Sequence, residues 1–158
     1  MRSYASTGKE KVVPKSTLLM AVKTADTSRT STTATNDPDL VLTLESNSTY
    51  AFVMFGSVVP ASGSAIKYTW GGTATASNFI GVNPIWNILF LGFSIPFITS
   101  FNAAATQNTG AQNGNNMLEG WGSIEVNAGG TFSYQWASNN GNATILKAGS
   151  YLQALKIS

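Results

Sequence analysis

Apolar side chains recur at every second position in several short stretches of this sequence. Rows of this kind occupy residues 40–44, 66–70, 124–126 and 132–136. Because side chains alternate between the two faces of a strand, each row predicts a strand with one face on a core and the other toward water. Gly, Asn, Ser and Pro separate the rows, and no stretch has the capped 3.6-residue stripe of a helix. The pattern predicts an all-β fold: an antiparallel β-sandwich, jelly-roll-like, of about eight strands.

The charged residues, only 10% of the 158-residue chain, are unevenly placed. Six of the nine basic residues fall within the first 29 positions, where only two acidic residues oppose them. This basic, polar leader predicts an extended N-terminal arm over residues 1–23, followed by one sandwich domain over residues 24–158. Its basic residues are spaced out and lack interleaved aromatic residues, so we expect no nucleic-acid partner and instead an acidic protein surface.

The chain contains no His and no Cys. It therefore lacks the commonest general base, the thiolate nucleophile and the usual zinc ligands. Glu119 and Glu125 on one strand would lie about 20 Å apart, too far to act directly as a glycosidase pair. Asp37 and Asp39 flank Pro38 at a turn, where acidic side chains accept backbone N–H groups more often than they bind calcium. We expect no enzymatic activity, no metal and no cofactor.

Residues 79–98 form an uncharged apolar segment. Two prolines and two glycines interrupt it below the length of a membrane-spanning helix, so we expect no membrane partner. Two interpretations stay open: a strand or strand pair in the core, or a segment that packs on its own domain with one face and on a neighbouring subunit with the other. The second interpretation predicts these subunit-interface residues: Ile85, Trp86, Ile88, Leu89, Phe90, Leu91, Phe93, Ile95 and Phe97.

Aromatic residues in the strand rows allow two interpretations. On an exposed sheet they can stack on sugar rings, whereas their parity with Ile66 and Phe132 favours burial in the core. The residues concerned are Tyr68, Trp70, Trp121, Tyr134 and Trp136. A secreted carbohydrate-binding module fits less well, because the N-terminus lacks the apolar core of a signal peptide. The charge-free segment 102–116 predicts a long loop, either a contact loop or a tolerated insertion.

Three segments of the C-terminal half form a recognisable pattern. They read LEGWGSIEV at 118–126, GTFSYQWA at 130–137 and SNNGNATILKAGSYLQALKI at 138–157. Together with residues 17–70, they resemble small virion structural proteins of tailed bacteriophages, of the head decoration (cement) or fibre type. Residues 79–116 depart from the pattern of that family.

The resemblance implies a function in the virion. We expect a non-enzymatic decoration protein, a homo-oligomer and most simply a trimer, that binds the major capsid protein on the outer surface of the phage head. The basic arm would supply the capsid contacts through Arg2, Lys9, Lys11 and Lys15. The alternative is a head-fibre or tail-fibre module that recognises a glycan on the host surface.

Overall fold

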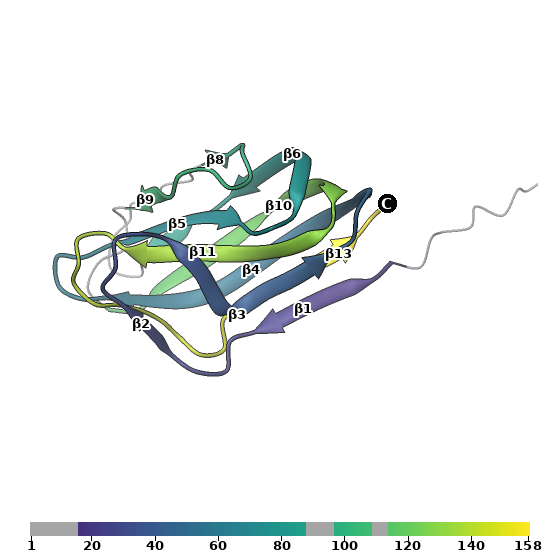
Figure 1. The fold of residues 1–158 in the computed structure, drawn as a ribbon. Helices are drawn as coiled ribbons and strands as arrows, with labels where there is room; N and C mark the ends of the chain where they lie inside the picture. The colour runs from purple at the N-terminus through teal and green to yellow at the C-terminus, as the bar shows by residue number, and fades with distance from the viewer. Residues whose placement is uncertain (1–15, 88–96, 109–113) are drawn as a thin grey trace, which may run out of the picture.

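A computed structural model of the chain describes residues 16–87, 97–108 and 114–158, and these residues contain thirteen strands and no helix (Figure 1). Eight strands have five or more residues, matching the number expected, and the other five have two or three. The strands are β1 (Leu18–Val22), β2 (Thr27–Arg29), β3 (Thr35–Leu44), β4 (Ser48–Pro60), β5 (Ile66–Gly71), β6 (Thr75–Val82), β7 (Ile85–Asn87), β8 (Phe97–Ile98), β9 (Thr106–Asn108), β10 (Asn116–Ala128), β11 (Gly130–Ser138), β12 (Thr144–Leu146) and β13 (Tyr151–Lys156).

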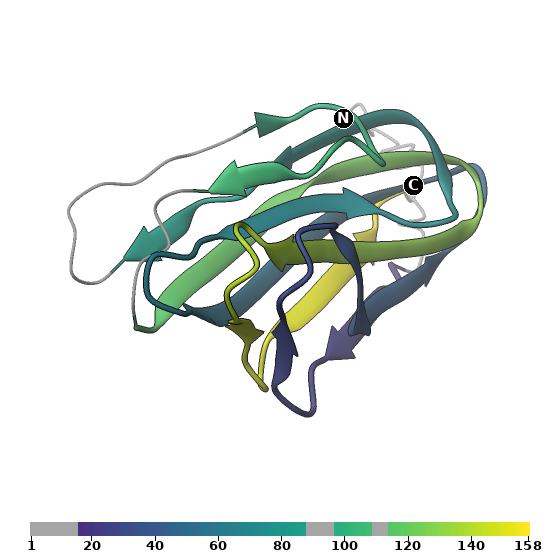
Figure 2. The same cartoon turned by 60° about the vertical axis from the view of Figure 1, so that its left-hand side comes forward.

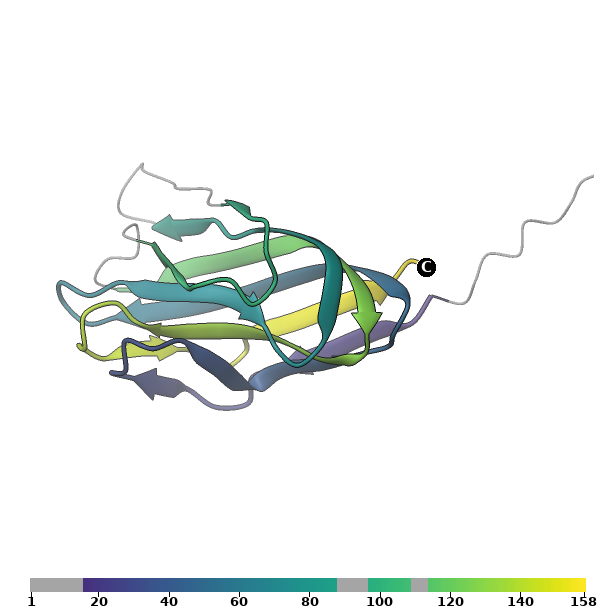
Figure 3. The same ribbon diagram turned by 45° about the horizontal axis from the view of Figure 1, so that its top comes forward.

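The strands form two antiparallel sheets that lie one over the other (Figure 3). The larger sheet has nine strands in the main order β1-β13-β4-β10-β6-β8, with β12 also on β4, β2 on β12 and β7 on β10. The smaller sheet has four strands in the order β3-β11-β5-β9. In the turned view the long strands β4 and β10 run side by side through the larger sheet (Figure 2). The predicted antiparallel β-sandwich is confirmed.

Aromatic side chains fill the space between the two sheets. Phe52 from β4 lies 4.7 Å, between ring centroids, from Trp70 of β5, and 5.0 Å from Phe132 of β11. Trp70 and Phe132 stack at 5.3 Å, so that both sheets contribute rings to one cluster. The predicted burial is confirmed for Tyr68, Trp70, Tyr134 and Trp136, and it is wrong for Trp121, which is 44% exposed.

The sandwich begins earlier in the chain than the sequence predicted. Strand β1 pairs with β13 from Leu18 opposite Leu155 to Val22 opposite Tyr151, and the side chain of Lys23 is buried. The predicted boundary at residue 23 is therefore wrong, because residues 18–23 belong to the larger sheet and its core. The four expected capsid-contact residues of the arm, Arg2, Lys9, Lys11 and Lys15, lie outside the described residues.

The segment predicted as one long loop at 102–116 contains regular structure at both of its described ends. Residues 106–108 form β9, which pairs with β5, and residue 116 begins β10. Residues 109–113 lie outside the description. Within the part of the chain that is described, no helix has the length and apolar character to cross a membrane.

Candidate functional site

Large apolar side chains cover the outer face of the nine-stranded sheet, the face turned away from the core. They come from alternate positions of β1, β13, β4, β10 and β6, whose other positions point inward. We call this surface the apolar face, and it consists of Leu18, Met20, Val22, Val53, Phe55, Ile80, Trp121, Tyr151 and Leu155. Contiguous exposed apolar patches mark sites of contact with other molecules.

The strand register places these residues side by side. Met20 of β1 lies opposite Gln153 of β13, Gln153 lies opposite Val53 of β4, and Val53 lies opposite Trp121 of β10. Directly opposed residues on one face of an antiparallel sheet have Cβ atoms about 5 Å apart. Met20 is 54% exposed and Trp121 is 44% exposed. The face is therefore one continuous surface across four strands.

Few polar groups interrupt the apolar face. Among the described residues, the rows of paired positions that make up the apolar face contain one charged side chain, that of Glu119. It lies opposite Phe55, at the margin of the face. Beside Val53 the surface has a shallow hollow of about 280 Å³, lined by Leu18, Ala51, Phe52, Val53, Gln153 and Leu155. The face thus offers contacts with apolar atoms and almost no partner for an ion pair.

Two glycines hold Trp121 on this face. A Cβ atom at Gly120 would lie 2.8 Å from Cζ2 of the buried Trp70, and a Cβ atom at Gly122 would lie 2.0 Å from the backbone oxygen of Ile80. Both positions face inward, where only a hydrogen atom fits. Strand β10 therefore lies close on the core, and the indole between the glycines points outward.

The outer face of the four-stranded sheet is polar by contrast. Ser133 Oγ donates a hydrogen bond to Asn36 Oδ1 at 2.7 Å, and Gln135 Nε2 donates to the same oxygen at 2.8 Å. Thr69 Oγ1 donates to the backbone oxygen of Ala103 at 3.1 Å. Ser133 and Thr69 are buried and Asn36 is exposed, and all of these polar groups find hydrogen-bond partners within the chain.

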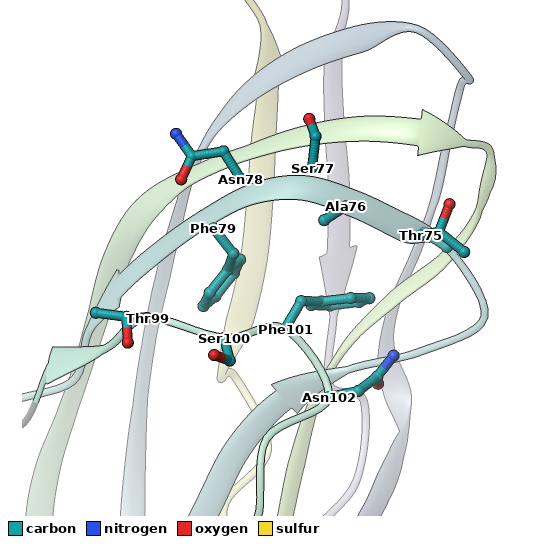
Figure 4. Close-up of a pocket in the computed structure, with 10 residues that line it drawn as sticks. Thr75, Ala76, Ser77, Asn78, Phe79, Thr99, Ser100, Phe101 and Asn102 are labelled. Atoms are coloured by element: carbon teal, nitrogen blue, oxygen red, sulfur yellow. The ribbon is translucent and has the colours of Figure 1, made fainter.

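A second hollow, of about 410 Å³, lies between β6 and residues 99–102 (Figure 4). Phe79 and Phe101 both line it, and their rings pack against each other at a tilt, with their centroids 5.7 Å apart. Asn102 closes one end, since its backbone has a φ of 59° and its side chain exchanges two hydrogen bonds with the backbone of Gly72. The other lining residues are Ala74, Thr75, Ala76, Ser77, Asn78, Thr99 and Ser100. The hollow joins uncharged hydroxyl and amide groups to an aromatic ring.

A buried ionic cluster joins the two sheets behind the turn between β1 and β2. Lys23 Nζ lies 3.0 Å from Asp37 Oδ2 and 3.2 Å from Asp39 Oδ2, and it donates to Thr27 Oγ1 at 2.6 Å. Asp37 Oδ2 also accepts the indole N–H of Trp136 at 3.0 Å. The ammonium group therefore lies between the two carboxylates, and the cluster connects the turn after β1 to β3.

Asp37 also shapes its own turn. Its Oδ1 accepts the backbone N–H groups of Asp39 at 3.0 Å and of Leu40 at 3.2 Å. The sequence predicted this use of an acidic turn residue, and the prediction is confirmed. It did not reveal that Lys23, assigned to the arm, would be the charge partner.

Arg29, at the end of β2, holds the beginning of β3 in place through hydrogen bonds to its backbone. The guanidinium of Arg29 donates to the backbone oxygens of Thr35, Asn36 and Trp136 at 2.6 to 2.8 Å, and its centre lies 4.3 Å from the ring centroid of Trp136. Partial burial lowers the pKa of Arg29, and the nearby Asp37 acts in the opposite direction. Arg29 thus serves the fold and not the surface charge of an arm.

The structure describes three of the nine predicted subunit-interface residues. Ile85 is 1% exposed, because it packs in the chain's own core, so its assignment to a subunit interface is wrong. Trp86 lies in β7 opposite Met117, and Phe97 in β8 is 68% exposed. The remaining predicted residues lie outside the described part of the chain: Ile88, Leu89, Phe90, Leu91, Phe93 and Ile95.

Sequence reasoning missed the apolar face as a site. One available signal was the stretch 50–55, which is apolar on both faces of one strand. The alternation of Leu18, Met20 and Val22 was a second signal, and it was assigned to the arm. Only the register of β1, β13, β4 and β10 shows that these residues share one surface.

The comparisons with known proteins give little. No known family model matches the chain, and no curated protein matches it. One solved structure that aligns is described as "Structure of infectious bursal disease virus Gx strain", with 10% sequence identity and a TM-score of 0.22. The alignment covers 90% of this chain and 40% of that chain, so this chain spans less than half the length of the viral one. A likeness this slight establishes neither a shared fold nor a shared function.

Proposed function

We propose that this chain is a non-enzymatic structural protein of a virion, a decoration (cement) protein on the outer surface of a tailed-phage head. The observation that carries the proposal is the apolar face, because an exposed apolar surface of this kind marks a chain that works in contact with other protein chains. The sequence resemblance to small phage virion proteins supplies the virion setting. A charge-poor sandwich with one apolar outer face suits a subunit that works inside an assembly.

The proposed mechanism is a passive clamp. Burial of apolar surface stabilises a contact by about 25 cal/mol per Å², and a shell carries many copies of such a contact. Each copy bound across neighbouring capsid subunits raises the free energy needed to separate them. The partner is the major capsid protein, and the basic residues before β1 provide the electrostatic part of the contact.

Binding to shells tests the proposal. We expect the purified protein to cosediment with mature phage heads assembled without it, and a chain that lacks residues 1–15 to keep its fold and lose this binding. The deletion stops before β1, because residues 18–23 belong to the sandwich. Heads that sediment without the full-length protein would contradict the proposal.

A second function, a fibre module that binds a host glycan, is favoured by the polar hollow of Figure 4. Phe101 offers a half-exposed ring, and Asn78, Thr99 and Ser100 offer exposed uncharged polar groups beside it. Aromatic stacking with neutral hydrogen-bonding groups is a suitable combination for a sugar ring. The test is binding to host cells or isolated surface glycans without any capsid, which Phe101→Ala should abolish if this function is correct.

A further inference from the structure

We infer that the apolar face is the contact between two copies of this chain, packed face to face about a two-fold axis. The inference deepens the proposed function and rests on it in one respect, that the protein works as an assembled subunit. It names the first partner of that subunit as a second copy of itself. It places the contact on the outer surface of β1, β13, β4 and β10, whereas one of the two interpretations of the sequence placed it at residues Ile85 to Phe97.

The exposed area fits a stable contact between two chains. Eight large side chains of the face are between 38% and 59% exposed. At about 200 Å² for each such side chain, they expose roughly 700 to 800 Å², which is close to what one partner contributes to an interface of standard size. A patch on a protein that stays monomeric is smaller, roughly 300 to 600 Å².

The shape of the patch favours a pair over a ring. In a ring, each subunit meets its two neighbours through two different surfaces, whereas a two-fold pair uses the same surface on both copies. The apolar face is one continuous surface on one side of one sheet. A second copy of the same sheet covers it whole, as sheets pack in a sandwich at about 10 Å separation.

The charge pattern permits self-contact. Like charges would oppose each other in a two-fold contact, and across the central rows of this face the described side chains are uncharged. Glu119 lies at the margin, opposite Phe55. The hollow beside Val53 takes a large apolar side chain of the opposing copy, and a two-fold axis near β4 brings Trp121 of one copy toward the hollow of the other.

Sedimentation equilibrium of the full chain over a concentration series tests the inference. We expect the wild-type protein to approach a mass of twice 16.6 kDa. The double variant Phe55→Ser/Trp121→Ser should have the mass of one chain, with a self-dissociation constant raised about 100-fold or more, as expected when central aromatic anchors are removed. Both side chains point away from the core between the sheets, so we expect the double variant to remain folded, which circular dichroism checks.

Two further variants keep the result interpretable. Val41→Ser makes a similar change on the outer face of the smaller sheet and should pair like the wild type. Met20→Lys places a charge on the exposed strand β1 and should dissociate the pair even if the double variant fails to fold. A wild-type protein that stays a single chain, a mass of three chains, or a Met20→Lys variant that still pairs would overturn the inference.

Shell binding separates this inference from the proposed function. A protein that is monomeric alone and cosediments with heads through the apolar face would overturn the pairing and leave the decoration function standing. A protein that pairs as expected and does not cosediment with heads would support the pairing and contradict the decoration function.

Discussion

The two outer faces of this sandwich differ in character: the outer face of the four-stranded sheet is polar, whereas that of the nine-stranded sheet is apolar. On the four-stranded sheet, Asn36, Ser133 and Gln135 form hydrogen bonds with one another, so the face is satisfied in water without a partner. On the nine-stranded sheet, the corresponding alternate positions carry side chains such as Met20 and Trp121. The first face is complete within the chain, whereas the second leaves large apolar side chains exposed, and we have proposed that a second protein covers them. A strand pattern therefore shows where a core lies, and the outward positions show where a partner lies.

We expect the largest loss of stability from a substitution in the buried ionic cluster that joins the two sheets. Asp37→Asn removes the fully buried one of the two carboxylates that face the ammonium of Lys23, leaving only the partly exposed Asp39, and weakens the acceptor for the indole of Trp136. Removing one partner of a buried ion pair costs about 3 to 5 kcal/mol, and we expect the free energy of unfolding to fall by that amount in urea titrations. Asp26→Asn, at an exposed ion pair, is the control. A loss below 1 kcal/mol for Asp37→Asn would show that the cluster does not hold the layers together.

We expect the second-largest loss of stability from a substitution at Gly122, beneath the apolar face. Gly122→Ala places a Cβ atom 2.0 Å from the backbone oxygen of Ile80 and 2.6 Å from Cζ of Phe52. Backbone must move to admit it, and overpacking of this kind costs roughly 1 to 3 kcal/mol. Thermal unfolding followed by circular dichroism measures the loss. Ser123→Ala, at the adjacent outward position, should unfold like the wild type, and equal stability of both variants would contradict the close approach of β10 and β6.

Exchanging polar for apolar groups distinguishes the two faces directly. Asn36→Ala removes the oxygen that accepts from Ser133 and Gln135, and should cost about 1 kcal/mol of unfolding free energy. Gln153→Leu, in the middle of the apolar face, should leave the unfolding free energy unchanged and strengthen pairing. Urea titration and sedimentation together measure both quantities. Weaker pairing of Gln153→Leu would contradict an apolar contact at this position.

We expect the smallest effect from Asp26, as a dependence of the free energy of unfolding on pH. A hydrogen bond from Lys147, and then one from the backbone N–H of Ala148, lower the pKa of Asp26 below its ordinary value. A carboxyl group with a lowered pKa in the folded state stabilises the fold at neutral pH, and this contribution is lost as pH falls below about 4 through the folded-state pKa. Asp26→Asn should therefore be slightly less stable than the wild type at pH 7 and equal to it in strong acid. A stability difference that persists in acid would contradict this origin.

The sequence predicted the fold class well because strand periodicity is a local property. Rows such as Leu40, Leu42 and Leu44 point to one face wherever the strand lies, and all three are buried. Residues 18–23 were misassigned because basic charge at Lys23 suggested a solvated arm. Its burial depends on Asp37 and Asp39, which only the tertiary fold brings to it.

The candidate site was harder to predict because it depends on register. Strand alternation places Trp121 on one face of its strand, but the sequence pattern alone does not say which of the two faces meets the core. Gly120 and Gly122 decide it, since their missing side chains let the strand approach Trp70 and Phe52. A glycine on each side of an aromatic residue is a signal that the aromatic side chain points outward, and the sequence contained it.

The most direct test of the apolar face as a protein contact is hydroxyl-radical labelling of the wild-type chain at low and high concentration. We expect labelling of Met20, Phe55 and Trp121 to fall as the concentration rises through self-association, and labelling of Phe101, in the polar hollow, to stay constant. Labelling of Met20 and Trp121 that does not change with concentration would contradict it, because these side chains would then remain in water.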